Sequence, residues 1–308
     1  MYNIIPVILA GGEGNRLKPL STKKKPKQFL KLSSGKNKLS LLQETAKRAL
    51  QIADAKNIIV ISSQTHKKIA IKQLGKINTD LCNNIILEPC PKNTAMAISI
   101  AAIHAANNHT DPVLLIMPSD HLINDSTELI YGIKSSIAAA NRGHIVLFGI
   151  NPTREDGNFG HIVQGDESLF GELFEVDGFI EKPDREKLST LTKQDKKWWN
   201  SGMFLMSTRT FFSEMKKKNT DVLTKASNAY SSIKESDYGY TINESLYSDV
   251  RSISIDKAII EDSKNLLVKP VDIDWYDLGS WQSVWELSQK EGKGTPLENF
   301  LYKIATAS

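Results

Sequence analysis

A short apolar run that ends in a glycine-rich, basic loop constrains the fold of this chain more than any other feature. Residues Ile4–Ala10 read IIPVILA, which is typical of a strand buried on both faces of a parallel sheet. Glycines follow at Gly11, Gly12 and Gly14, and basic side chains follow at Arg16, Lys18 and Lys27. Glycine lets several backbone N–H groups approach an anion closely. The segment therefore predicts an α/β protein that binds the phosphates of a nucleoside triphosphate at the end of its first strand.

Two common phosphate-binding motifs do not match this turn. A P-loop needs Lys followed by Ser or Thr after its last glycine, whereas Asn15 follows Gly14 here. A dinucleotide fingerprint that starts at Gly12 needs a small residue at the position of Leu17. The remaining alternative is an ordinary turn between a strand and a helix.

Composition sets the class of protein. The 308 residues are 40% hydrophobic, enough for one large domain with a full core. The net charge of +4 is concentrated at Lys23–Lys27 and Lys216–Lys218, which favours local anion binding over a nucleic-acid surface. No apolar run approaches the roughly 20 residues that cross a bilayer, and no signal peptide is apparent. We therefore expect a cytoplasmic protein without nucleic-acid or membrane partners, in which Cys82 and Cys90 are free thiols.

Strand-like and helical patterns alternate in the first half, which predicts a doubly wound sheet with helices on both faces. The predicted strands there are Ile4–Ala10, Asn57–Ser62, Asn84–Leu87, Val113–Met117 and Ile145–Ile150. Ser40 and Gln43 form a predicted capping box, and the alanine-rich segment Thr94–Asn108 predicts a buried helix. In the less regular second half, strands are predicted at Leu173–Glu181 and Asn200–Ser207 and helices at Thr208–Lys218 and Ser280–Lys290.

Polar residues follow several of these strands, where ligands of open α/β sheets bind. Glu88 and Asn93 can bond a base or ribose; the alternative is a rigid turn in which Asn93 or Thr94 caps a helix. Asp120 follows the fourth strand and is a natural ligand for the Mg²⁺ that accompanies nucleotide phosphates. Asp277 is the candidate second carboxylate, although it could instead cap the helix that begins near Ser280.

Several longer motifs resemble the mannose-1-phosphate guanylyltransferases of the sugar-phosphate nucleotidyltransferase superfamily. The superfamily signature corresponds to Gly11–Leu17, Pro19–Ser21 and Pro26–Lys27. Narrower signals are Pro26–Phe29, Glu88–Pro89, Asn93–Ala95, Ser119–His121, Phe179–Pro183, Trp199–Phe204, Ser254–Asp256 and Asp277–Trp281. Where relatives usually carry Gly-Tyr-Gly-Tyr, the chain has Asn158–His161, which keeps the second glycine but not the first. Cys90–Lys92 also departs from the Gly-Arg that often precedes Asn-Thr in the family.

The resemblance implies a role for each matching residue. Nucleotide binding is assigned to Leu9, Gly11, Gly12, Gly14, Glu88, Asn93, Thr94 and Ser119, with Arg16 and Lys27 on the triphosphate. Sugar-phosphate binding is assigned to Gly160, Glu181, Lys182 and Asn200, and metal binding to Asp120 and Asp277. The expected catalytic residues are Arg16, Lys27 and Lys182, which neutralise charge. His121 is expected to position the loop that carries Asp120, and the five tryptophans are expected to be core residues.

By the same resemblance, we expect a Rossmann-like mixed sheet and a nucleotidyltransferase domain over residues 1–290, with a tail at 291–308. Residues 1–150 would bind the nucleotide and 151–290 the sugar phosphate. The implied reaction transfers GMP from GTP to mannose 1-phosphate, with Mg²⁺ as cofactor and pyrophosphate as leaving group, and a homodimer is possible. The alternatives are another pair of nucleotide and sugar 1-phosphate, of glucose or heptose type, or a non-catalytic nucleotide-sugar sensor.

Overall fold

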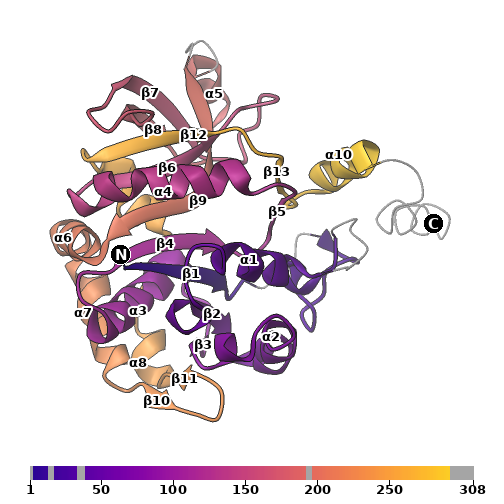
Figure 1. Cartoon of the computed structure of the whole chain (residues 1–308), viewed down its shortest axis with the longest axis vertical. Helices are drawn as coiled ribbons and strands as arrows, with labels where there is room; N and C mark the ends of the chain where they lie inside the picture. Colours follow the sequence, from indigo (N-terminus) through magenta and orange to yellow (C-terminus); the bar gives the residue numbers. More distant parts are fainter. Residues whose placement is uncertain (1–2, 13–16, 33–38, 192–195, 292–308) are drawn as a thin grey trace.

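A large mixed sheet forms the centre of the computed structural model, which describes residues 3–12, 17–32, 39–191 and 196–291, apart from the side chains of 282 and 288–291. Within the described residues this sheet has 11 strands in the order β10-β11-β3-β2-β1-β4-β9-β6-β12-β8-β7. Figure 1 shows the sheet running through the whole molecule, from β10 at one end to β7 at the other. A separate pair joins β13 to β5.

The strands are β1 (Ile4–Ala10), β2 (Ile59–Ser63), β3 (Ile85–Glu88), β4 (Val113–Pro118), β5 (His121–Ile123), β6 (Ile145–Ile150), β7 (His161–Glu167), β8 (Phe174–Ile180), β9 (Lys197–Ser207), β10 (Lys234–Glu235), β11 (Tyr240–Thr241), β12 (Leu266–Val271) and β13 (Trp275–Asp277). The helices are α1 (Leu41–Ala49), α2 (Lys67–Leu74), α3 (Asn93–Asn108), α4 (Thr127–Asn141), α5 (Arg185–Leu191), α6 (Thr208–Lys218), α7 (Thr220–Tyr230), α8 (Glu244–Ser248), α9 (Ile255–Ala258) and α10 (Trp281–Glu291). A 3-10 turn, η2, spans Lys27–Phe29.

Helices cover both faces of the sheet, as the sequence predicts. Ile4 and Ile8 of β1 belong to one apolar cluster, together with side chains of α1, α2 and α4. Ile5 and Val7 belong to a second cluster, with side chains of α3, α6 and α7. Because successive residues of a strand point to opposite faces, the continuous apolar run of β1 is explained by burial on both sides. The predicted helix over the alanine-rich segment is α3, which is buried from Ala95 to Ala102.

The mixed character of the sheet is confirmed, and it depends on β9. This strand lies antiparallel between β4 and β6, so the fourth and fifth predicted strands are not neighbours. The last two strands in the sheet order, β8 and β7, are partly exposed, which removes the continuous apolar run by which a buried strand is recognised. The capping box of α1 is present, with both the Ser40 side chain and the Gln43 side chain bonded to backbone.

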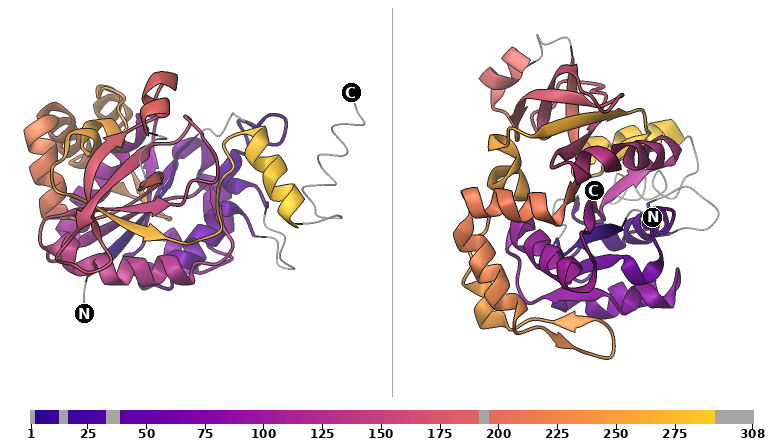
Figure 2. Two further views of the ribbon diagram at one scale, coloured as in Figure 1. Left: turned by 90° about the horizontal axis from the view of Figure 1, so that it is seen from above. Right: turned by 60° about the vertical axis from the view of Figure 1, so that its left-hand side comes forward.

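Helix α10 lies at one end of the molecule, beside the N-terminal part of the chain (Figure 2). A third apolar cluster joins Val284 and Leu287 of α10 to Leu17, Leu30 and Leu41. Trp285 on the same helix is 54% exposed, so the expectation that all five tryptophans are core residues is wrong for this one.

Within the described residues, none of the helices is both long and apolar enough to cross a membrane. Cys82 and Cys90 are free thiols.

Candidate active site

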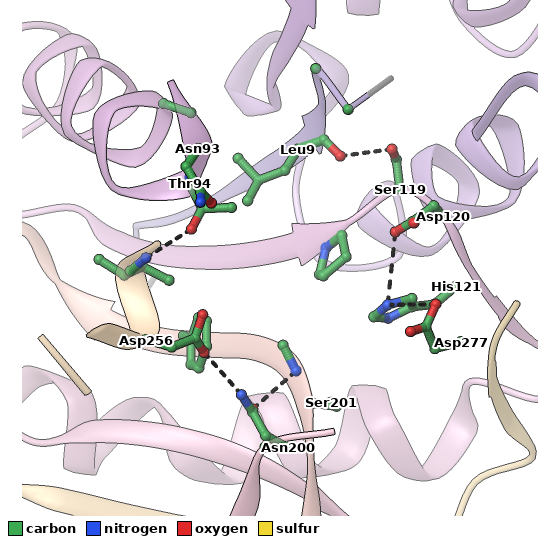
Figure 3. A pocket seen from close by; sticks show the side chains of 18 of the residues that line it. Leu9, Asn93, Thr94, Ser119, Asp120, His121, Asn200, Ser201, Asp256 and Asp277 are labelled. Atoms are coloured by element: carbon green, nitrogen blue, oxygen red, sulfur yellow. Dashed lines mark hydrogen bonds and ion pairs between the residues drawn. The ribbon is translucent and has the colours of Figure 1, made fainter. Parts of the chain in front are cut away.

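A cavity of about 480 Å³ opens where the predicted site residues come together. Figure 3 shows Leu9, Asn93 and Thr94 on one side of it, Asn200, Ser201 and Asp256 across from them, and Asp120, His121 and Asp277 on a third side. The predicted site residues that line it are Leu9, Gly11, Gly12, Glu88, Asn93, Thr94, Ser119, Asp120, Gly160, Glu181, Lys182, Asn200 and Asp277. Lys27 lies behind this wall, and Gly14 and Arg16 fall outside the described residues.

The glycine turn at the end of β1 is held by two neighbouring segments. The Gln28 amide donates hydrogen bonds to the carbonyls of Ala10 at 3.0 Å and Gly12 at 2.7 Å. The Ser119 hydroxyl donates to the Leu9 carbonyl at 2.7 Å and ties the end of β4 to β1. These bonds hold the turn at the cavity wall, which Gly11 and Gly12 line.

Glu88, at the end of β3, is a buried carboxyl group at the cavity wall. It accepts a short hydrogen bond from the hydroxyl of the buried Tyr247, on α8. Burial raises the pKa of Glu88 to about 7, although the bond from Tyr247 lowers it. Near neutral pH this group therefore exists in both forms, and its protonated form donates a hydrogen bond that a carboxylate cannot.

The loop after β3 does not use its polar residues as an ordinary helix cap. Asn93 is the first residue of α3 and has a left-handed backbone (φ 63°), and its side chain accepts a bond from the Thr94 N–H at 2.9 Å. The Thr94 hydroxyl accepts a bond from the backbone N–H of Ile255 at 2.8 Å. Backbone strain at a cavity wall is typical of functional positions, and Lys182 shows it as well (φ 48°).

The two predicted metal ligands face each other across one ammonium group. Lys27 Nζ lies 3.0 Å from Asp120 Oδ2 and 2.7 Å from Asp277 Oδ1. Burial alone lowers the pKa of Lys27, but the two carboxylates outweigh it and raise the pKa above its usual value. The capping alternative for Asp277 is not what the structure shows, because Ser280 accepts the bond from the Ser283 N–H at 3.2 Å.

His121 lies between these carboxylates and a tryptophan. Trp275 Nε1 donates to His121 Nδ1 at 3.2 Å, and His121 Nε2 is 3.8 Å from Asp120 Oδ1 and 3.9 Å from Asp277 Oδ1. A ring nitrogen that accepts a bond leaves the proton on the other nitrogen, so the neutral ring directs Nε2–H toward the carboxylates. Burial lowers the pKa of His121, despite the raising effect of the two carboxylates.

The opposite side of the cavity brings Gly160, Glu181 and Asn200 into contact. A Cβ added at Gly160 would lie 2.6 Å from Glu181 Oε2 and 3.1 Å from Asn200 Cβ. The Asn200 N–H donates to the Gly160 carbonyl at 2.7 Å. A side chain at position 160 would therefore displace the Glu181 carboxyl group and crowd Asn200. Asn158, the departure from the family pattern, bonds Asp156 through its backbone N–H and its side chain at 3.0 and 2.7 Å.

Asp256 is a site residue to which the sequence analysis gave no role. It lines the cavity and accepts a hydrogen bond from Asn200 Nδ2 at 3.0 Å. Burial and the nearby Glu181 carboxylate raise the pKa of Asp256 to about 6. Asn200 Oδ1 accepts from the Gly202 N–H at 3.0 Å, so both ends of the amide are fixed. The ammonium of Lys182 is 3.2 Å from Glu181 Oε1, and the Lys182 side chain is 61% exposed.

Gln28 and Tyr247 also contribute and lacked a predicted role, and Trp275, which was expected only in the core, bonds His121 as well. Gln28 and Asp256 lie inside quoted motifs, so their motifs carried a signal that was not used. Tyr247 contacts Glu88 across 159 positions and has no local sequence signal.

The donor set at Asp120 and Asp277 suits a divalent cation. Carboxylate oxygens are the protein ligands that Mg²⁺ prefers, and here two of them already share one cationic group, the Lys27 ammonium. The described cavity wall carries carboxyl groups at Glu88, Asp120, Glu181, Asp256 and Asp277, against Lys92 and Lys182. An anionic ligand would therefore need additional positive charge to enter this cavity.

Comparison with known proteins agrees with this fold. A family model described as nucleotidyl transferase matches residues 5–294. A mannose-1-phosphate guanylyltransferase from Salmonella muenchen is 38% identical over 304 residues, covering 98% of this chain and 62% of that protein. One from Escherichia coli is 36% identical over 297 residues, covering 96% of this chain and 62% of its own length. The chain thus spans less than two thirds of these relatives.

One solved structure shows the same fold. The mannose-1-phosphate geranyltransferase from Thermus thermophilus superposes with a TM-score of 0.80 at 23% identity, covering 92% of this chain and 79% of that one.

Proposed function

Because the chain belongs to the nucleotidyl transferase family, we propose that it transfers GMP from GTP to α-D-mannose 1-phosphate, giving GDP-mannose and pyrophosphate. The curated relatives that it resembles over nearly its whole length carry the name mannose-1-phosphate guanylyltransferase, which supports this pair of substrates. In this proposal the nucleotide binds at the glycine turn and Glu88. The sugar phosphate binds at Glu181, Lys182 and Asn200.

One observation carries the proposal: both sets of residues line the same cavity, and the Asp120–Asp277 pair faces it as well. A volume of about 480 Å³ is within the range of sites that hold a nucleotide-sized ligand. A nucleotide-sugar sensor would also occupy both sets, but it could lack the metal carboxylates or the phosphate-binding cation, and Asp120, Asp277 and Lys27 are all present here. A transferase needs these groups, arranged so that the sugar phosphate can reach the α-phosphate of the nucleotide.

The proposed reaction is a direct substitution at phosphorus. An oxygen of the mannose phosphate forms a bond to the α-phosphorus of GTP, the bond from that phosphorus to the bridging oxygen breaks, and pyrophosphate leaves with the electron pair. The sugar phosphate is ionised near pH 7, so a general base is not needed. Both reactants are anions, and the protein accelerates the step by aligning them and neutralising their charge.

Different residues of this chain would align the reactants and neutralise their charge. The backbone of the Gly11–Gly12 turn would hold the phosphates, Lys27 and Lys182 would neutralise charge, and Asn200, fixed at both ends of its amide, would orient the sugar. Asp120 and Asp277 would hold Mg²⁺, which supplies positive charge to the phosphate oxygens when bound.

The test is pyrophosphate release by the purified chain with Mg²⁺, crossing four nucleoside triphosphates with mannose, glucose and galactose 1-phosphates. The proposal expects release only with GTP and mannose 1-phosphate, together with GDP-mannose identified by chromatography. Removal of the metal with EDTA should stop the reaction, and added Mg²⁺ should restore it. Release with another pair would keep the chemistry but overturn the substrates. Nucleotide binding without release for every pair would favour a sensor.

A further inference from the structure

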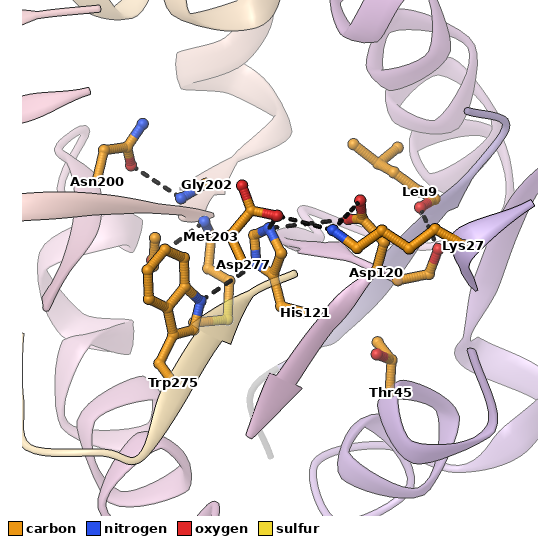
Figure 4. A network of polar contacts seen from close by, with 12 residues as sticks. Leu9, Lys27, Thr45, Asp120, His121, Asn200, Gly202, Met203, Trp275 and Asp277 are labelled. Atoms are coloured by element: carbon orange, nitrogen blue, oxygen red, sulfur yellow. Dashed lines mark hydrogen bonds and ion pairs between the residues drawn. The ribbon is translucent and has the colours of Figure 1, made fainter. Parts of the chain in front are cut away.

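The ammonium of Lys27 occupies a position that links the two predicted metal ligands. Figure 4 shows the Lys27 side chain reaching Asp277, with Asp120 beside the same nitrogen. Lys27 is only 3% exposed, whereas the side chains of Asp120 and Asp277 are 33% and 18% exposed and line the cavity. The lysine therefore pairs with the carboxylates from the protein interior, whereas the two aspartates themselves line the cavity.

Two carboxylates that share one ammonium at 2.7 and 3.0 Å repel each other in this partly desolvated site, and the cation between them offsets that repulsion. A divalent ion bound to both would sit close to the Lys27 nitrogen and be repelled by it. The metal and the ammonium therefore compete for the same pair of carboxylates.

We propose that Lys27 is a built-in counter-ion, which holds Asp120 and Asp277 in the free protein and withdraws when a divalent metal arrives with the triphosphate. This inference rests on the proposed nucleotidyl transfer. Metal and nucleotide then bind cooperatively, because the nucleotide offers the displaced ammonium a new anionic partner. The bare metal ion is largely excluded from the free protein.

The local structure keeps the displaced ammonium near the phosphates. The next residue, Gln28, is bonded to the carbonyls of Ala10 and Gly12, so the backbone at Lys27 is tethered to the glycine turn. The four-carbon stem of lysine has several rotatable bonds and can move its nitrogen without moving the backbone. Lys27 can thus exchange carboxylate for phosphate while η2 stays in place.

The experiment measures binding of Mn²⁺ by electron paramagnetic resonance, with and without α,β-methylene-GTP, and subtracts the metal bound by the analogue alone. Three proteins are compared: the wild type, Lys27→Met and Lys269→Met. Lys269 is a matched control, because it is a buried lysine (6% exposed) that is ion-paired to Glu172 and lies outside the cavity.

We expect the wild type to bind Mn²⁺ at least about tenfold more tightly with the analogue than without it. Lys27→Met should raise the affinity of the free protein for Mn²⁺ by about tenfold or more and shrink the effect of the analogue. Lys269→Met should behave as the wild type. If Lys27→Met leaves the affinity of the free protein unchanged or weakens it, the proposal is wrong.

Loss of Lys27 also leaves two carboxylates without their counter-ion, so the variant could be unstable. Circular dichroism melting controls for this, and Mn²⁺ should raise the melting temperature of Lys27→Met more than that of the wild type. The wild-type titration is decisive on its own: equal Mn²⁺ affinity with and without the analogue would overturn the proposal whatever the variant does.

The same wild-type preparation is assayed for pyrophosphate release, which separates the two proposals. GDP-mannose formation by the wild type without tighter Mn²⁺ binding by Lys27→Met would overturn only the counter-ion. Tighter Mn²⁺ binding by the variant, with no pyrophosphate release by the wild type for any pair, would overturn only the transferase.

Discussion

Gly11 and Glu88 are matched to each other across the cavity wall: a Cβ added at Gly11 would overlap Glu88 Oε2 and lie 3.2 Å from its Cδ. Gly11 directly follows β1, and β2 separates β1 from β3, which carries the carboxyl group at its end. The missing side chain at position 11 therefore fixes where the buried carboxyl group can lie.

Substitution of Gly11 should disturb both stability and the cavity. In Gly11→Ala, the new methyl group displaces Glu88 from its bond with Tyr247, and we expect a loss of about 1–3 kcal/mol in the free energy of unfolding. Gly12→Ala is the matched control, because a Cβ there meets nothing within 4 Å. It should change stability by less than about 0.5 kcal/mol. Urea denaturation measures both, and equal losses in the two variants would contradict the steric argument.

The buried carboxyl group predicts a specific dependence of stability on pH. The pKa of Glu88 is about 7 in the folded protein and 4.5 in the reference state, so folding strengthens its hold on the proton. Its contribution to stability is complete below pH 4.5 and is lost as the pH rises through about 7. Relative to Glu88→Gln, the wild type should therefore lose up to about 3 kcal/mol between pH 5 and pH 8.

Urea denaturation of both proteins at several pH values measures this difference. Acid denaturation elsewhere in the molecule affects both proteins and cancels. A stability difference that stays constant from pH 5 to pH 8 would show that Glu88 does not carry a raised pKa.

The elements that sequence predicts well here are those whose burial is continuous or whose caps are local. The bounds of β1, β6 and α6 agree with the prediction, and Ser40 caps α1 through a residue only three positions away. Such signals lie within one segment, because the pattern of a buried strand or a capping box does not depend on what the segment packs against.

Features that depend on contacts between distant residues could not be predicted from the sequence. The insertion of β9 between β4 and β6 depends on which strand ends meet in space. The bond between Tyr247 and Glu88 and the Lys27 bridge between two carboxylates join residues more than 80 positions apart. The pKa of a group such as Asp256 follows from burial and neighbours, which only the folded chain defines. The resemblance named residues that the structure brings together around one cavity, whereas the electrostatics of that cavity had to come from the structure.

The bond between Trp275 and His121 should matter for the metal site more than for stability. Trp275→Phe keeps an aromatic ring beside Phe159 and Trp199 but removes the N–H that fixes the protonated nitrogen of His121. We expect a loss of about 1 kcal/mol in stability and a rise in the metal concentration needed for half-maximal pyrophosphate release. The control is Trp285→Phe, since Trp285 is 54% exposed. If the two variants require the same metal concentration, His121 is not positioned through Trp275.

Asp256 should affect the binding of the sugar phosphate and leave the binding of the nucleotide unchanged. In Asp256→Ala, Asn200 loses the partner of its Nδ2 atom, while its Oδ1 atom keeps the bond from Gly202. The amide is then held at one end only, and we expect KM for mannose 1-phosphate to rise about tenfold while KM for GTP stays within about twofold. Asp256→Asn retains an acceptor for the same bond and should recover most of the affinity. Asp249→Ala, at a side chain that is 74% exposed and paired with Lys225, should have no effect. A rise in both KM values, or failure of the asparagine variant to recover affinity, would mean that the charge of Asp256, or the fold around it, matters more than its bond to Asn200.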